Sequence, residues 1–95
     1  MNKAKFNLGQ TVQTRGIAEA CADNEEFTKE IYTAFSKYIA CDWGDTCEED
    51  AELNNQAIAN NDDRVVAKYK TSKGNIFIIT EWDRSYTTIM FADEY

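Results

Sequence analysis

The stretch Ile76-Phe77-Ile78-Ile79-Thr80-Glu81-Trp82 is apolar on both alternating sets of positions, a pattern typical of a strand at the centre of a sheet. Before it, 64–70 alternates between its two faces, and Ser72-Lys73-Gly74-Asn75 has the composition of a hairpin turn. After it, Asp83-Arg84 suits a tight turn, and 85–91 is again rich in Tyr, Thr and Ile. These residues predict a three-stranded antiparallel meander.

Helices precede this meander. In 24–40 apolar residues recur at helical spacing, Asp23 or Asn24 suits the N-cap, and Glu25 and Glu26 suit the positive end of the helix dipole. The positions expected to be buried are Phe27, Ile31, Ala34, Phe35, Tyr38 and Ile39.

A second helix is predicted over 46–59. Thr46-Cys47-Glu48-Glu49 fits a capping box, with the Thr hydroxyl at the cap and a Glu three residues later. A short helix is also predicted over 17–22, with Thr14 as its cap. The side chains that the 46–59 helix is expected to bury are Leu53, Ala57 and Ile58.

The order of these elements defines the fold class. Residues 6–12 are rich in strand formers, so the chain runs from one strand through two to three helices to the meander. This order predicts an α+β fold with the helices packed on one face of a four-stranded sheet. The edge at which the first strand joins is left open. At 95 residues, 1–95 is expected to form a single domain.

Composition narrows the function classes. The chain has no histidine, and Cys21, Cys41 and Cys47 form no CxxC pair, so we expect no metal, no cofactor and free, mostly buried thiols. Cys47, at a predicted helix start, is the one candidate nucleophile, although neighbouring acids oppose its ionisation. Because no apolar stretch resembles a signal peptide or a membrane span, we expect a cytoplasmic protein without membrane contact.

Charge is segregated along the chain. Seventeen acidic and ten basic residues give a net charge of −7. Residues 42–63 contain eight acids and no Lys or Arg, whereas the other 73 residues hold nine acids and ten bases. This net charge argues against direct binding of nucleic acid or of an anionic membrane, since both need basic surface, and the expected partner is a protein with a basic groove.

The first candidate binding surface lies around the break between the two longer helices. Its acids fit a solvated helix start, an interaction surface or a metal site. Trp43 either fills the core or anchors a partner. The candidate residues are Asp42, Trp43, Asp45, Glu48, Glu49 and Glu52.

The second candidate surface is the turn between the last two strands. Trp82 and Arg84 are residue types enriched in binding hot spots, and a hairpin would project them together with Asp83. Alternatively, Trp82 packs over the sheet while Asp83 and Arg84 form an ion pair that closes the turn.

A resemblance covers nearly the whole chain. It is carried by Leu8-Gly9-Gln10-Thr11-Val12-Gln13-Thr14-Arg15-Gly16, by Asp42-Trp43-Gly44-Asp45 with Cys47-Glu48-Glu49-Asp50, by Ile78-Ile79-Thr80-Glu81-Trp82-Asp83-Arg84-Ser85 and by Asp93-Glu94-Tyr95. These stretches resemble a family of short plasmid- and conjugative-element-related proteins of Firmicutes bacteria. Members are sometimes labelled as type I restriction modification subunits, but this sequence lacks the glycine-rich cofactor loop and the length of a methyltransferase.

The resemblance implies a mobile-element setting, in which small acidic proteins inhibit host nucleases by presenting carboxylates in place of DNA phosphates. The leading hypothesis is therefore a non-enzymatic binding protein, an anti-defence inhibitor of a CRISPR or restriction nuclease. One alternative is a structural or accessory protein that acts by homodimerisation or as a small subunit, through an exposed strand edge and Trp82. Another is a carboxylate-based metal-dependent enzyme built on Asp45, Glu49, Glu81 and Asp83.

Overall fold

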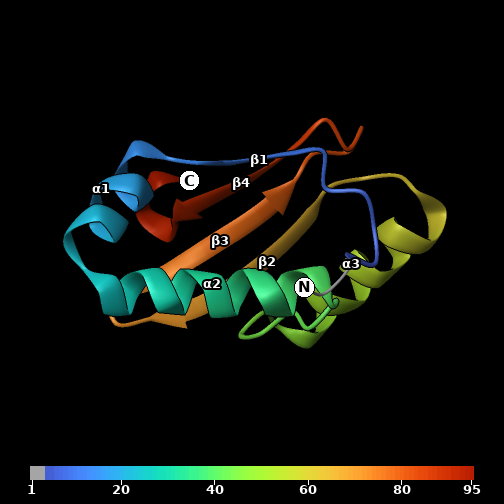
Figure 1. The fold of residues 1–95 in the computed structure, drawn as a ribbon. Coiled ribbons are helices and arrows are strands. Elements are labelled where there is room, and N and C mark those ends of the chain that lie inside the picture. The colour runs from blue at the N-terminus through green and yellow to red at the C-terminus, as the bar shows by residue number, and fades with distance from the viewer. Residues whose placement is uncertain (1–3) are drawn as a thin grey trace.

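The computed structural model describes residues 4–95. The elements follow in the order β1 (Gln10–Gln13), α1 (Arg15–Asp23), α2 (Glu25–Ile39), α3 (Glu48–Asn60), β2 (Val65–Thr71), β3 (Gly74–Thr80), β4 (Tyr86–Phe91) and the 3-10 turn η1 (Ala92–Glu94). This is the predicted α+β order of an N-terminal strand, helices and a three-stranded meander (Figure 1).

The sheet is mixed, with strand order β1-β4-β3-β2. The meander is antiparallel, and Ile78 at the centre of β3 pairs with Ala67 of β2 and Ile89 of β4. β1 joins the free side of β4 in parallel, with Val12 opposite Thr88. The first strand therefore joins the meander at the β4 edge, which the sequence did not decide, and β1 and β2 are the two outer strands.

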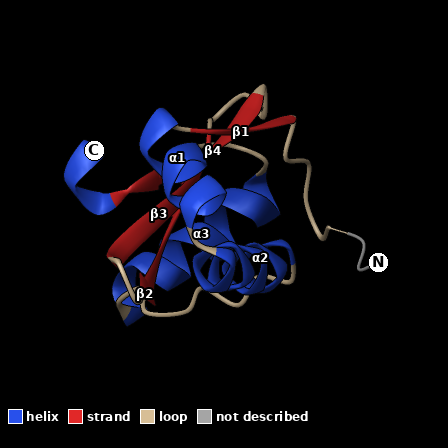
Figure 2. Cartoon of the chain, turned by 60° about the vertical axis from the view of Figure 1, so that its left-hand side comes forward, coloured by secondary structure: helices blue, strands red, loops and turns tan. Residues whose placement is uncertain are grey.

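The core lies between the helices and one face of this sheet. α2 crosses that face, and Figure 2 shows α2 and the C-terminal η1 on opposite sides of the strands. The apolar stripe of α2 is buried as predicted, except for the half-buried Phe35. The buried cluster consists of Ile17, Phe27, Ile31, Ala34, Tyr38, Trp43, Ala57, Val65, Ala67, Tyr69, Ile76, Ile78 and Ile89.

Four polar groups run through the middle of this core. The Tyr38 hydroxyl lies 2.7 Å from Thr80 Oγ1, which lies 2.7 Å from Thr87 Oγ1. Thr87 in turn donates to the carbonyl of Leu8. Because Thr87 donates its proton to that carbonyl, Thr80 donates to Thr87, and the single Tyr38 proton is shared between Thr80 and the Val65 carbonyl, which lies 3.2 Å away. The network ties α2 to β3, β4 and the segment before β1.

Two helix caps agree with the sequence prediction. Thr14 Oγ1 accepts a hydrogen bond from the Ile17 amide at the start of α1, and Asn24 Oδ1 accepts one from the Phe27 amide at the start of α2. Each cap satisfies an amide that has no partner within its helix.

Other predictions at the element ends are wrong. β1 begins at Gln10 rather than at residue 6, because Gly9 has φ +63° and so does not have extended backbone. A side chain at position 9 would collide with the main-chain oxygens of Arg84 and Ser85. The N-cap of α3 is Cys47, not Thr46, and it makes no side-chain capping bond. Leu53 was expected to be buried but is 55% exposed, whereas its neighbour Asn54 is buried.

Candidate functional site

The outer edge of β2 is covered by side chains from the segment before it. The Asn54 amide donates to the Val66 carbonyl at 2.9 Å and accepts from the Val66 amide at 3.0 Å. Thr46 Oγ1 accepts from the Lys68 amide, and the Asp45 amide donates to the Lys68 carbonyl. These contacts replace a neighbouring strand, which explains why Thr46 does not cap α3.

Trp43 fills the core rather than forming an anchor for a partner. It is 7% exposed, its ring packs on Tyr38 and Phe6, and its Nε1 donates to Asn55 Oδ1 at 2.9 Å. Gly44 follows it with φ +60°, and a side chain at Gly44 would collide with the Tyr69 ring. Trp43 is therefore removed from the candidate binding surface.

The acids of 42–63 are all exposed. Between residues 4 and 95 the two ion pairs are Arg15 with Glu19 and Lys29 with Glu26. None of the acids of 42–63 therefore takes part in an ion pair there. Three of the carboxylates accept bonds from nearby or adjoining main-chain amides, namely Asp42 from Gly44, Asp45 from Lys70, and Asp63 from Arg64.

The start of α3 carries the remaining dense group of carboxylates. Its first turn contains Glu48, Glu49 and Asp50, and Glu52 follows two residues after Asp50. The positive end of the helix dipole favours acids here, but it does not require four of them. We define the acidic end of the molecule as Asp42, Asp45, Glu48, Glu49, Asp50 and Glu52.

Arg84 does not form the expected ion pair with Asp83. It is 7% exposed, and its guanidinium donates to main-chain carbonyls at the end of α3 and in two turns. The cation thus lies at the negative end of the α3 dipole and is unavailable to a partner. The acceptors are the carbonyls of Ala57, Asp62, Asp63, Glu81 and Trp82.

Trp82 and Asp83 remain at the surface of the same turn. Trp82 is 64% exposed. Asp83 accepts bonds from both the amide and the hydroxyl of Ser85, which lower the pKa of its carboxyl below the usual range. Of the three residues proposed for this tip, the structure leaves two exposed and buries Arg84.

The structure does not gather the acids proposed for a metal-dependent enzyme. Across residues 4–95 no group of three or more Cys, Asp and Glu side chains is placed to hold a metal ion. The thiols are more accessible than expected, because Cys21 and Cys41 are half-buried and Cys47 is exposed. Burial raises the pKa of the Cys41 thiol, partly offset by the charge of Lys5.

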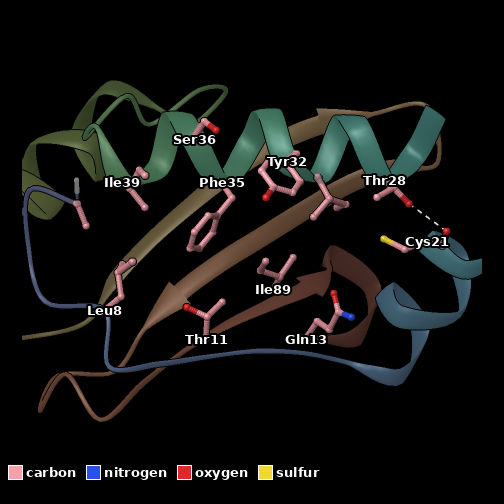
Figure 3. A pocket seen from close by; sticks show the side chains of 12 residues that line it. Leu8, Thr11, Gln13, Cys21, Thr28, Tyr32, Phe35, Ser36, Ile39 and Ile89 are labelled. Atoms are coloured by element: carbon pink, nitrogen blue, oxygen red, sulfur yellow. Dashed lines mark hydrogen bonds between the residues drawn. The ribbon is translucent and has the colours of Figure 1, made fainter. Parts of the chain in front are cut away.

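A groove of about 930 Å³, which the sequence did not predict, runs between α2 and β1 (Figure 3). The Thr28 hydroxyl donates to the Cys21 carbonyl near one end, and Leu8 and Ile39 line the other. No lining residue is charged. The lining is Ala4, Leu8, Thr11, Gln13, Cys21, Thr28, Ile31, Tyr32, Phe35, Ser36, Ile39 and Ile89.

The fold and these surfaces define a small α+β domain with an acidic end beside β2 and an uncharged groove beside β1. No protein-family model matches the chain, and neither the curated proteins nor the solved structures gave a match. None of the helices in the described part of the chain has the length and apolar character needed to cross a membrane.

Proposed function

We propose that this protein acts by binding another protein, and that the acidic end contacts a basic groove on that partner. The observation that carries this proposal is the set of exposed acids at 42–63 without any ion pair between residues 4 and 95. Elsewhere in the chain acids and bases balance, so the excess negative charge has one location. Such a surface attracts a basic partner over several ångströms and speeds association.

The partner class that suits this surface is a protein that normally binds DNA. Acids three or four residues apart on α3, such as Glu48 with Glu52 and Glu49 with Glu52, lie on neighbouring turns with Cβ atoms about 5 to 6 Å apart. One strand of duplex DNA carries about one charge per 3.4 Å of axis, so such a row has a charge spacing of the same order as the phosphates of one strand. With the resemblance to mobile-element proteins, this favours an inhibitor of a restriction or CRISPR nuclease.

The test is competition with labelled duplex DNA for a panel of purified restriction and CRISPR nucleases, measured by fluorescence polarisation. The native protein should displace DNA from at least one nuclease. The triple variant Glu48→Gln, Glu49→Gln, Glu52→Gln should compete at least about tenfold less well. The effect should weaken between about 50 mM and about 200 mM salt, because the contact is electrostatic.

A matched control changes the same number of charges elsewhere. Asp23→Asn, Glu25→Gln, Glu26→Gln neutralises exposed acids just before and within the first turn of α2, so it resembles the first variant in charge and helix position. The control should compete like the native protein, and circular dichroism should show both variants folded. If the two variants lost competition equally, net charge alone would explain the effect. If the native protein displaced DNA from none of the nucleases, the DNA-mimic proposal would be rejected.

A further inference from the structure

The outer edge of β1 is an open strand edge. The amides of Gln10 and Thr14 donate to the Ser85 and Ile89 carbonyls of the β4 side. Successive residues of a strand direct their main-chain groups to opposite sides, so residues 10, 12 and 14 face β4. Thr11 and Gln13 therefore direct their N–H and C=O groups away from the sheet, where residues 4–95 provide no further strand.

The opposite edge of the sheet, on β2, is covered by side chains and main chain from the preceding segment. On β2 the outward groups of Val66 and Lys68 and the outward amide of Lys70 are bonded by Asn54, Thr46 and Asp45. Exposed strand edges invite pairing with another chain, and proteins block them with charged residues, Pro, bulges or covering segments. Within residues 4–95, β1 is a short strand of four residues but has none of these other protections, since Gln-Thr-Val-Gln is uncharged, lacks Pro and is exposed at all four positions.

We infer that β1 is a self-association edge, which pairs antiparallel with β1 of a second copy of this chain. An axis of twofold symmetry at Val12 places Thr11 opposite Gln13 of the second copy. These are the residues whose main-chain groups point outward, so each of the two pairs exchanges two hydrogen bonds. The product is a continuous eight-stranded sheet with β2 at both ends.

Charge favours a second copy at this edge over any other edge of the molecule. Neither β1 nor the groove beside it contains a charged side chain, so two copies meet without like-charge contact. The acidic end lies along β2, at the far side of the strand order. In the dimer the two β2 strands are seven spacings apart, roughly 33 Å, several times the Debye length of about 8 Å at physiological salt.

This inference is independent of the proposed function, because the acidic end and β1 lie at opposite edges of the sheet. Sedimentation equilibrium over a range of concentrations tests it directly. The apparent mass should rise from that of one 10.9 kDa chain towards twice that value. Thr11→Pro should hold the protein monomeric, because it removes an outward N–H without removing a bond to β4.

The matched control is Thr11→Val, which keeps the main-chain N–H and should dimerise like the native protein. Monomer mass for the native protein up to about 1 mM would overturn the inference. Equal dimerisation of both variants would also overturn it.

Cysteine cross-linking fixes the register and remains decisive if Thr11→Pro does not fold. In a Cys47→Ser background, Val12→Cys places the two new thiols in a non-hydrogen-bonded pair with Cα atoms about 4.5 Å apart, within disulfide range. Gln10→Cys is the control, because it is exposed on the same strand but its two copies lie roughly 14 Å apart. With oxidised glutathione, Val12→Cys should form the linked dimer at least about tenfold faster; equal rates would overturn the register.

Discussion

Arg84 donates a hydrogen bond from Nη2 to the carbonyl oxygen of Ala57 at 3.0 Å, which fastens the turn between β3 and β4 to the last turn of α3. The same guanidinium bonds the carbonyls of Asp63 and Glu81 through Nη1. Its backbone has φ +60°, so the residue holds an unfavourable conformation that these bonds must offset. The Ala57 and Glu81 carbonyls also accept main-chain amides, so the guanidinium adds a second donor to each, and its loss removes the link between the turn and α3.

Replacing Arg84 with Met should destabilise the fold by about 3 kcal/mol, because the five hydrogen bonds that join the end of α3 to the two turns are lost together. Urea denaturation followed by circular dichroism measures this change. Trp82→Ser in the same turn is the control and should stay within about 0.5 kcal/mol, since Trp82 is exposed. Equal destabilisation by the two variants would show that the turn, not the guanidinium, holds the two elements together.

Asn54→Leu should lower the free energy of unfolding by about 2 kcal/mol, because the Val66 amide and carbonyl both lose their partner. This loss is expected although Leu is the better helix former. Hydrogen exchange should show the Val66 amide protected in the native protein and much less so in the variant. Gln56→Leu, at an exposed position of α3, provides the control and should leave that protection unchanged. Retained protection in Asn54→Leu would contradict the role of this side chain at the β2 edge.

Alkaline pH should destabilise the protein through its buried tyrosines. Burial raises the pKa of Tyr38 and of Tyr69 above the usual 10. Above pH 10 the unfolded chain releases these protons while the folded chain keeps them, so the free energy of unfolding falls as pH rises. Below pH 10 this contribution is fully present and does not vary.

Tyr38→Phe isolates one of these groups. At pH 8 it should be less stable than the native protein by about 1 to 2 kcal/mol, because the bonds to Thr80 and to the Val65 carbonyl are lost. This difference in the free energy of unfolding should narrow above pH 10, because unfolding of the native protein then releases the Tyr38 proton and the variant has no such proton to release. Urea titrations at several pH values measure this difference in the free energy of unfolding. A difference that stays constant up to pH 11 would contradict the burial of the Tyr38 hydroxyl.

The three thiols should differ in reactivity. Cys47 is exposed at the N-cap of α3, whereas Cys41 is half-buried and has a raised pKa. Since the thiolate is the reactive form, iodoacetamide at pH 8 should alkylate Cys47 before Cys41. Peptide mass spectrometry after short labelling times gives the order, and labelling in urea should remove the difference. Faster labelling of Cys41 under native conditions would contradict it.

Sequence periodicity predicted the elements because it reflects local requirements. The alternation of 64–70, the apolar run of 76–82 and the helical stripe of 24–40 all depend on neighbours a few positions away. The caps at Thr14 and Asn24 are equally local, since each bonds an amide three residues later. The capping box at Thr46 failed because its hydroxyl bonds the Lys68 amide, 22 residues away.

Parts of the candidate site followed from the sequence and parts did not. The acidic segment was predicted, and all of its acids are exposed. Trp43 and Arg84 were named as partner contacts, but both are buried. Whether such amphipathic side chains point inward depends on acceptors that other elements supply, here Asn55 for Trp43 and the end of α3 for Arg84.

By itself the sequence determined the strands, the helices, their order and the separation of charge, because these arise from spacing and composition along the chain. Only the tertiary structure decided that β1 joins β4, that Asn54 rather than Leu53 turns inward, and that one sheet edge is covered while the other is open. Those outcomes depend on main-chain hydrogen bonds between segments far apart in sequence, which amino-acid spacing does not encode.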